Sequence, residues 1–188
     1  SLDATTAGYL TALPLLFIII SIWLKKVSLR KYLIPYYIIA SLLVAITFVV
    51  DMGLYPFWGF KLDASVFLYL DSPEEAMASV SAGFVAIRVL AMVLLAALYA
   101  WLLAKITPQK LEVVKKKVSG TGVMLLLTGV LFIIIRGGVT ESTSNVGQAY
   151  FSNNQFLNHS AVNPCFSLLS SMGKSKDFAS EFDFFAEE

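Results

Sequence analysis

The stretch that decides the fold crosses the end of the last apolar run: VSGTGVMLLLTGVLFIII, residues 118–135, followed by RGGVTESTSNVGQAYFSNNQFLNHSAVNP, residues 136–164. The first part is long enough to cross a bilayer, which takes about 20 residues in a helix. The second part begins with a double glycine and is rich in Asn, Ser and Thr. The boundary at Arg136 therefore separates a membrane region from a polar region outside the bilayer.

The composition of the 188-residue chain agrees with a membrane protein. It is 57% hydrophobic and 14% charged, with a mean hydropathy of +0.75, whereas soluble domains carry about 25% charged residues. The single cysteine, Cys165, excludes an internal disulfide, and the single histidine, His159, excludes the usual zinc spacings. Both residues are expected to pack or to form hydrogen bonds. The net charge is +1, and we expect no nucleic-acid partner.

Apolar runs predict an all-α membrane protein with four transmembrane helices. A single run of about eighteen residues could be a buried core helix, but four of them in one short chain favour membrane spans. We also expect a fifth span upstream, together with short interfacial and extracytoplasmic helices. The predicted spans are residues 7–24, 32–50, 80–104 and 118–135.

Two further helix starts are predicted from capping signals. Ser72 and Glu75 form a capping box, and the helix that they start is expected to continue into the third span. Asn163 precedes Pro164 and predicts a short helix that ends at Gly173. The aromatic stretch between the second and third spans, residues 57–70, is expected to lie at the membrane interface.

The charges of the loops predict the orientation of the spans. The loop between the second and third spans, residues 51–79, carries a single lysine among five acidic residues. By the positive-inside rule, the two basic loops are cytoplasmic and both ends of the chain lie outside. The residues that make those loops basic are Lys25, Lys26, Arg30, Lys31, Lys105, Lys110, Lys115, Lys116 and Lys117.

Three ionisable residues fall where the spans leave the bilayer on the outer side: Arg88, Asp51 and Arg136. Such residues are candidates for function, although they can also snorkel to the headgroups or form structural ion pairs. Two arginines and one carboxylate leave a positive surplus, and a guanidinium matches the geometry of a phosphate. We therefore expect a lipid or substrate headgroup site here. The sequence shows no pattern that indicates a catalytic residue or a metal ligand.

Residues 136–172, from RGGVTES through NPCFSLLSSM, resemble the bacterial lipoteichoic acid synthase-like membrane proteins of the sulfatase and alkaline phosphatase superfamily. The stretch WGFKLDASVFLYLDSPEEAMAS, residues 58–79, is similar to the same group. The resemblance implies five spans before an extracytoplasmic α/β catalytic domain with a Thr or Ser nucleophile and a divalent metal (Mn, Mg or Zn). That domain transfers phosphoglycerol or phosphoethanolamine, or hydrolyses sulfate or phosphate esters. No catalytic residue can be carried over to this chain.

On this resemblance, residues 1–136 are a transmembrane domain, and residues 137–188 are an extracytoplasmic linker to a catalytic domain outside the sequence. The membrane domain is expected to anchor the enzyme in the bacterial cytoplasmic membrane and to present anionic phospholipid at the outer leaflet. Two alternatives remain open: a small four-span transporter or channel subunit, and a non-enzymatic membrane scaffold. Against a transporter, no ionisable residue falls near the middle of a span, where transporter sites usually lie.

Overall fold

The computed structural model describes residues 1–24, 28–70, 80–109, 116–139 and 141–181. Within these ranges the chain forms helices and irregular segments and no β-strand, which confirms the predicted all-α class. The described elements are α1 (Leu2–Trp23), α2 (Leu29–Trp58), the 3₁₀ helix η1 (Ala64–Leu70), α4 (Ala82–Ile106), α5 (Lys117–Arg136), the 3₁₀ helix η2 (Val146–Ala149), α6 (Gln155–Ser160) and α7 (Pro164–Glu181).

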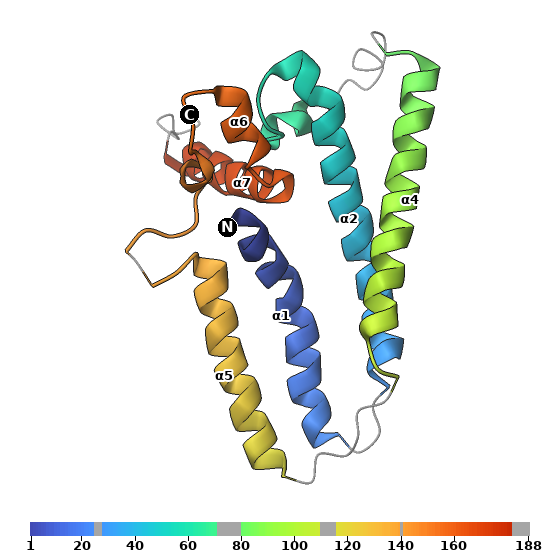
Figure 1. The fold of residues 1–188 in the computed structure, drawn as a ribbon, viewed down its shortest axis with the longest axis vertical. Helices are drawn as coiled ribbons and strands as arrows, with labels where there is room; N and C mark the ends of the chain where they lie inside the picture. Colours follow the sequence, from blue (N-terminus) through green and yellow to red (C-terminus); the bar gives the residue numbers. More distant parts are fainter. Residues whose placement is uncertain (25–27, 71–79, 110–115, 140, 182–188) are drawn as a thin grey trace, which may run out of the picture.

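Among the described elements, α1, α2, α4 and α5 are long and apolar enough to cross a membrane. Figure 1 shows them as two antiparallel pairs: α1 lies beside α5, and α2 lies beside α4. The helices α4 and α5 form the two flanks, with α1 and α2 between them. We call the end that carries the N-terminus, α6 and α7 the capped end. The opposite end, where α2 and α5 begin and where Lys105 lies in the last turn of α4, is called the basic end.

The spans match the predicted runs in order, but α2 is longer than expected. It continues past Val50 to Trp58, so that its last turns extend beyond the length that a bilayer core of about 30 Å requires. The helix ends at Gly59, whose φ of 70° is left-handed and whose N–H donates to the carbonyl of Tyr55 at 2.9 Å. A glycine adopts this conformation at no steric cost. The first part of the predicted interfacial stretch is therefore the end of α2.

The third span begins later than predicted. Ser81 caps α4, since its hydroxyl accepts from the N–H of Phe84 at 3.2 Å, and Val80 is not helical. The expectation of one unbroken helix from Ser72 into the span is therefore wrong, because the chain is already interrupted just before Ala82. The predicted capping box at Ser72 lies outside the described residues.

The two helix pairs pack in different ways. In the first pair, Gly8 of α1 lies so close to α5 that a Cβ atom there would be 2.7 Å from Cγ1 of Ile135. In the second pair, Leu33 and Tyr37 of α2 are buried and have Leu103 of α4 against them. No described residue of α4 or α5 is buried within the chain. Their outer faces are apolar, as lipid-facing surfaces must be.

The polar segment after α5 folds back over the capped end. The hydroxyl of Ser144 lies 2.9 Å from the hydroxyl of Thr5 at the start of α1. Further along, Nδ1 of His159 lies 3.1 Å from the Tyr55 hydroxyl. In α7, the hydroxyl of Ser171 accepts from a backbone N–H at the start of η1. These contacts hold α6 and α7 across the ends of the spans, as Figure 1 shows.

The start of α7 is as predicted, but its end is not. Asn163 caps the helix, since its Oδ1 accepts from the N–H groups of Cys165 and Phe166 at 3.0 and 3.2 Å. Its Nδ2 donates to Asp3 at 2.6 Å and ties the cap to the N-terminus. The helix passes through Gly173 with a negative φ. A glycine inside a helix costs only about 1 kcal/mol, so it does not end one by itself.

Candidate functional site

Asp51 is a structural anchor for the segment that follows α2. Its carboxylate is buried, forms an ion pair with Lys61 and accepts from the N–H of Leu62 at 2.9 Å. Both partners lie just beyond the left-handed turn at Gly59, so the carboxylate holds this reversed segment against the helix. The charge that was expected to balance an arginine is balanced by Lys61.

Arg88 lies at the same level as Asp51, but the two are not paired. Its Nε lies against Gly53, where a Cβ atom would be 3.5 Å away, and its guanidinium carbon is 4.3 Å from the ring centroid of Phe84. Within the described ranges, Nε has no hydrogen-bond partner. Arg88 is thus stacked on an aromatic ring in the groove between α4 and α2, rather than joined to a carboxylate.

Arg136 is the last residue of α5, on the other flank of the bundle. The helix stops there because Gly137 takes a left-handed φ of 92° and donates to Ile133 and Ile134. The carbonyl of Arg136 then accepts from the N–H of Ser144 at 2.8 Å, which closes the loop after the helix. The structure therefore places Arg88 and Asp51 together on the α2–α4 side, and Arg136 on the α1–α5 side.

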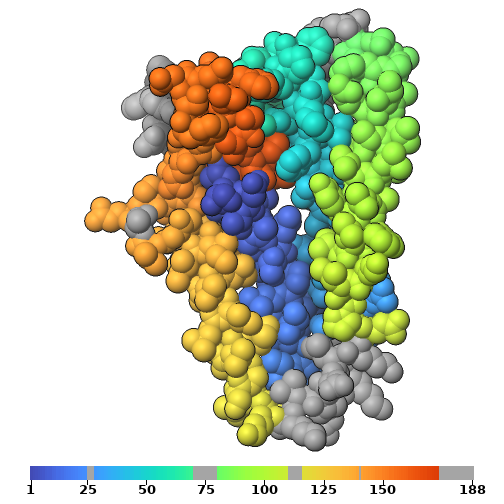
Figure 2. All heavy atoms as spheres, in the orientation of Figure 1, coloured from blue at the N-terminus to red at the C-terminus, as the bar shows by residue number. Residues whose placement is uncertain are grey.

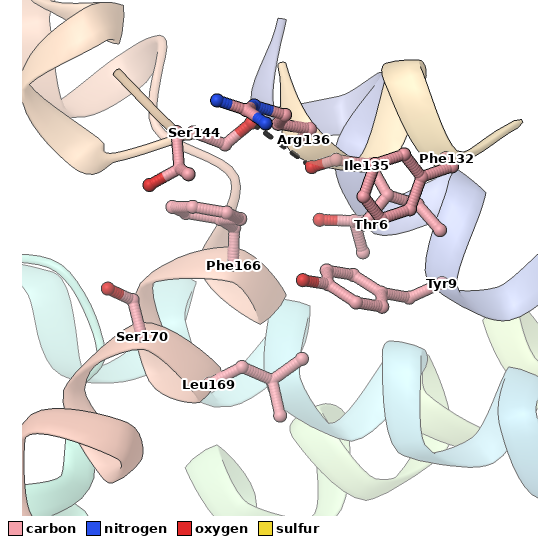
Figure 3. Close-up of a pocket in the computed structure, with 10 residues that line it drawn as sticks. Thr6, Tyr9, Phe132, Ile135, Arg136, Ser144, Phe166, Leu169 and Ser170 are labelled. Atoms are coloured by element: carbon pink, nitrogen blue, oxygen red, sulfur yellow. Dashed lines mark hydrogen bonds between the residues drawn. The ribbon is translucent and has the colours of Figure 1, made fainter. Parts of the chain in front are cut away.

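A cavity of about 760 Å³ opens beside Arg136, between α1, α5 and α7. In Figure 3, Arg136 and Ser144 lie on one side of it, Tyr9 and Leu169 lie on the opposite side, and Phe166 projects between them. The described residues that line it are Thr6, Tyr9, Phe132, Ile135, Arg136, Thr143, Ser144, Phe166, Leu169 and Ser170.

This cavity is amphipathic. Aromatic and aliphatic side chains come from α1, from the last turns of the candidate span α5, where Phe132 and Ile135 precede the end of the helix, and from α7. Hydroxyl groups come from α1, from the loop after α5 and from α7, and one guanidinium comes from Arg136 at the end of α5. A ligand in it would meet apolar walls on the membrane side and hydrogen-bond donors at the end of the span. This is the arrangement that a phospholipid requires where its headgroup joins its chains.

The polar wall of the cavity is held in place by the chain itself. Ser144 donates to the carbonyl of Ile135 at 3.3 Å and contacts Thr5, while Thr6 donates to the carbonyl of Leu2 at 3.0 Å. The guanidinium of Arg136 carries five N–H donors in a planar fork. It can therefore keep a contact within the protein and still present two donors to an anionic group.

Sequence reasoning found Arg136 but not the residues around it. Phe166, Leu169 and Ser170 are near it only because α7 folds back over the start of α1. The sequence signal that could have indicated this packing is Asn163. Its Oδ1 caps α7, and its Nδ2 remains free to donate to another segment, which in the structure is the N-terminus at Asp3. Thr6 and Tyr9 lie on an ordinary apolar helix, where nothing in the sequence distinguishes them.

A second polar cavity, of about 230 Å³, lies between α2 and α6. His159 is buried there, with its ring against Tyr55 and Tyr150, as expected for a packing and hydrogen-bonding residue. Across the ranges that the structure describes, no three His, Cys, Asp or Glu residues lie close enough to bind a metal ion. The described residues therefore offer no site for a divalent metal, which the family resemblance assigns to a catalytic domain outside this sequence.

Comparisons of the chain with protein-family models, with curated proteins and with solved structures give no match.

Proposed function

We propose that this chain is a membrane domain that holds an anionic phospholipid at the outer leaflet for an extracytoplasmic enzyme. The observation that carries the proposal is the amphipathic cavity at Arg136, which lies where α5 ends and combines apolar walls with a guanidinium. In this arrangement the lipid phosphate lies beside Arg136, and its acyl chains run along Phe132 and Ile135 toward the centre of the bilayer.

The choice of an anionic lipid follows from charge and geometry. Among the described residues that line the cavity, Arg136 is the one cation, and none carries a carboxylate. A guanidinium binds a phosphate through two parallel hydrogen bonds, which are stronger than bonds between neutral groups. A zwitterionic lipid would add a cationic group close to the arginine, so phosphatidylglycerol fits this cavity better than phosphatidylcholine.

The orientation in the membrane supports the same proposal. Lys105 in the last turn of α4, and Lys116 and Lys117 at the start of α5, lie at the basic end. The positive-inside rule makes that end cytoplasmic, which puts the capped end and its cavity at the outer leaflet. We propose the bacterial cytoplasmic membrane as the location.

The resemblance of residues 136–172 to the lipoteichoic acid synthase-like proteins supports the enzymatic part of the proposal. On this basis the parent enzyme is a phosphoglycerol or phosphoethanolamine transferase, or a related hydrolase. Its nucleophile and its divalent metal belong to a catalytic domain beyond this sequence. The role of this chain is to anchor that domain and to keep an anionic lipid within its reach.

The headgroup site can be tested by the lipids that the purified chain retains. The protein is placed in nanodiscs of phosphatidylcholine and phosphatidylglycerol, extracted gently and examined by native mass spectrometry. We expect bound phosphatidylglycerol, and Arg136→Gln should lower its retention by about tenfold, the size of one charge-assisted interaction. Lys116→Gln removes one charge at the other end and should have no effect. Equal retention of the two lipids, or an unchanged Arg136→Gln variant, rejects the site.

A further inference from the structure

A further cavity, of about 480 Å³, lies within the bundle, between α1, α2 and α4. Figure 2 shows the surface hollowed between α1, in blue, and α4, in green. None of the described residues that line it is Lys, Arg, His, Asp or Glu, and several carry hydroxyl groups. The lining residues that matter most are Leu10, Tyr36, Tyr37, Ser41 and Tyr99.

Two of the tyrosines in this cavity are fixed by hydrogen bonds across the helices. Tyr36 of α2 donates to the carbonyl of Leu10 in α1 at 2.6 Å. The hydroxyl groups of Tyr37 and Thr107 lie 3.1 Å apart and join α2 to the end of α4. These bonds keep the three helices at a fixed separation, so the space between them is part of the fold.

Ser41 is a polar residue of this cavity whose hydroxyl the described residues leave unpaired. It is 3% exposed, and its Oγ has no hydrogen-bond partner among the described residues. Other hydroxyl groups in the spans donate to a carbonyl of their own helix one turn earlier, which is the usual solution in an apolar environment. Those donors are Thr11 at 2.7 Å, Ser21 at 2.7 Å, Thr47 at 2.8 Å and Thr128 at 2.9 Å.

An unpaired hydroxyl in the membrane interior is costly, because no water is present there to form a hydrogen bond with it. A ligand that brings its own hydrogen-bonding group into the cavity removes that cost. The size of the cavity and its apolar walls with a few polar groups are typical of small-molecule sites between the helices of a bundle. Since the described lining carries no charge, a phosphate or an ammonium group would be desolvated there without compensation.

We infer that this cavity binds an uncharged, hydroxyl-bearing lipid of the diacylglycerol type, whose hydroxyl bonds to Ser41. The Tyr99 side chain borders the same space from α4 and offers a second hydroxyl. The acyl chains leave between α1 and α4, where the bundle is open. This site is separate from the cavity at Arg136 and does not depend on the function proposed for it.

The test uses a diacylglycerol that carries a photoreactive group and an alkyne on one acyl chain. The intact chain is reconstituted in nanodiscs with this probe and irradiated, and the labelled peptides are identified by mass spectrometry. We expect labelling of residues 36–44 of α2, and competition by unlabelled diacylglycerol. The readout is confined to α2, because no residue of α2 lines the cavity at Arg136.

Two variants and one control make the test specific. Ser41→Ala and Tyr99→Phe each remove one hydroxyl with little change in shape and should lower the labelling by about two- to tenfold, the range for one hydrogen bond. Ser21→Ala makes the same chemical change at a hydroxyl that is already satisfied, and should leave the labelling unchanged. Thermal unfolding establishes that each variant is folded.

Three outcomes overturn the inference. The first is no labelling of residues 36–44 above background, which would mean that the cavity holds only water or a loose acyl chain. The second is equal labelling by a phosphatidylcholine probe with the same photoreactive chain. The third is equal labelling in the wild type and in both hydroxyl variants, because Ser41 and Tyr99 would then not contact the ligand.

Discussion

The hydroxyl of Tyr36 donates a hydrogen bond of 2.6 Å to the carbonyl of Leu10, the carbonyl that Pro14 leaves without a helical partner. A proline has no N–H, so the carbonyl four residues earlier lacks its usual donor within the helix. In the membrane that carbonyl needs another donor. Tyr36 supplies it from α2, and the bond thereby links the α1–α5 pair to the α2–α4 pair.

We expect Tyr36→Phe to destabilise the bundle by about 0.5–1.5 kcal/mol, the usual range for one hydrogen bond. In a Pro14→Ala background the loss should be smaller, because an alanine at that position has an N–H that can donate to Leu10 within the helix. A double-mutant cycle, measured by unfolding in mixed detergent and SDS, gives the coupling between the two positions. Additive effects of the two substitutions would show that Tyr36 does not replace the donor missing at Pro14.

Gly8 sets the distance between α1 and α5. A Cβ atom at this position would lie 2.7 Å from Ile135, whereas a Cβ atom on Gly129 would meet nothing within 4 Å. Gly8→Ala should therefore cost about 1–3 kcal/mol through overpacking, although alanine is the better helix former. Gly129→Ala is the matched control and should be neutral or stabilising. Thermal unfolding in detergent compares them, and equal midpoints would contradict the close contact.

Lys61 compensates the buried charge of Asp51. Lys61→Met leaves the carboxylate with the hydrogen bond from the N–H of Leu62, at 2.9 Å, but without its counter-ion. Loss of one partner from a buried ion pair is strongly destabilising. We expect a loss of about 3 kcal/mol from Lys61→Met, and a smaller loss when Asp51→Leu is combined with it. An exposed control, Lys116→Met, should change stability by less than about 0.5 kcal/mol. A double variant less stable than Lys61→Met would contradict this role.

The sequence was sufficient to predict the spans, because the bilayer requires a certain length and hydropathy of each span, whatever its contacts with other parts of the chain. It did not predict the end of α2 or the course of α7. The path of the chain after α2 and the course of α7 depend on contacts of single polar groups, such as Asp51 with Lys61 and Asn163 with Asp3. Depth along a span can be counted from the sequence, but the direction in which a side chain points around the bundle cannot.

That distinction explains the outcome for the three candidate residues. Arg88, Asp51 and Arg136 were grouped by their depth alone. In the structure, Asp51 forms an ion pair with Lys61, and the guanidinium of Arg88 stacks on the ring of Phe84. Arg136 faces α1 and α7, whose contribution could not be foreseen because α7 reaches it from outside the membrane. The headgroup proposal therefore rests on Arg136 and on the residues that the fold brings to it.

The thiol of Cys165 reports on the docking of α7. Burial raises its pKa, the charge of Asp51 acts in the same direction, and a hydrogen bond with Thr47 partly offsets these effects. Because the pKa is raised, less thiolate is present at a given pH, and alkylation by iodoacetamide should require a higher pH than in the unfolded chain. Asn163→Ala, which removes the helix cap, should speed the reaction. Asn154→Ala removes the cap of α6 and serves as the control. Equal alkylation rates for Asn163→Ala and Asn154→Ala would show that the cap at Asn163 does not control the exposure of Cys165.

The orientation of the chain can be tested with cysteines introduced at the two ends of the bundle. Val139 follows α5 at the capped end and is 84% exposed, whereas Lys116 precedes α5 at the basic end and is also exposed. The buried Cys165 should contribute little background. A membrane-impermeant maleimide applied to intact cells should label Val139→Cys, and should label Lys116→Cys only after the membrane is made permeable. This follows because lysine-rich loops remain in the cytoplasm. The reverse pattern would place the cavity at Arg136 in the inner leaflet, and the proposed presentation of lipid to an outer enzyme would then be wrong.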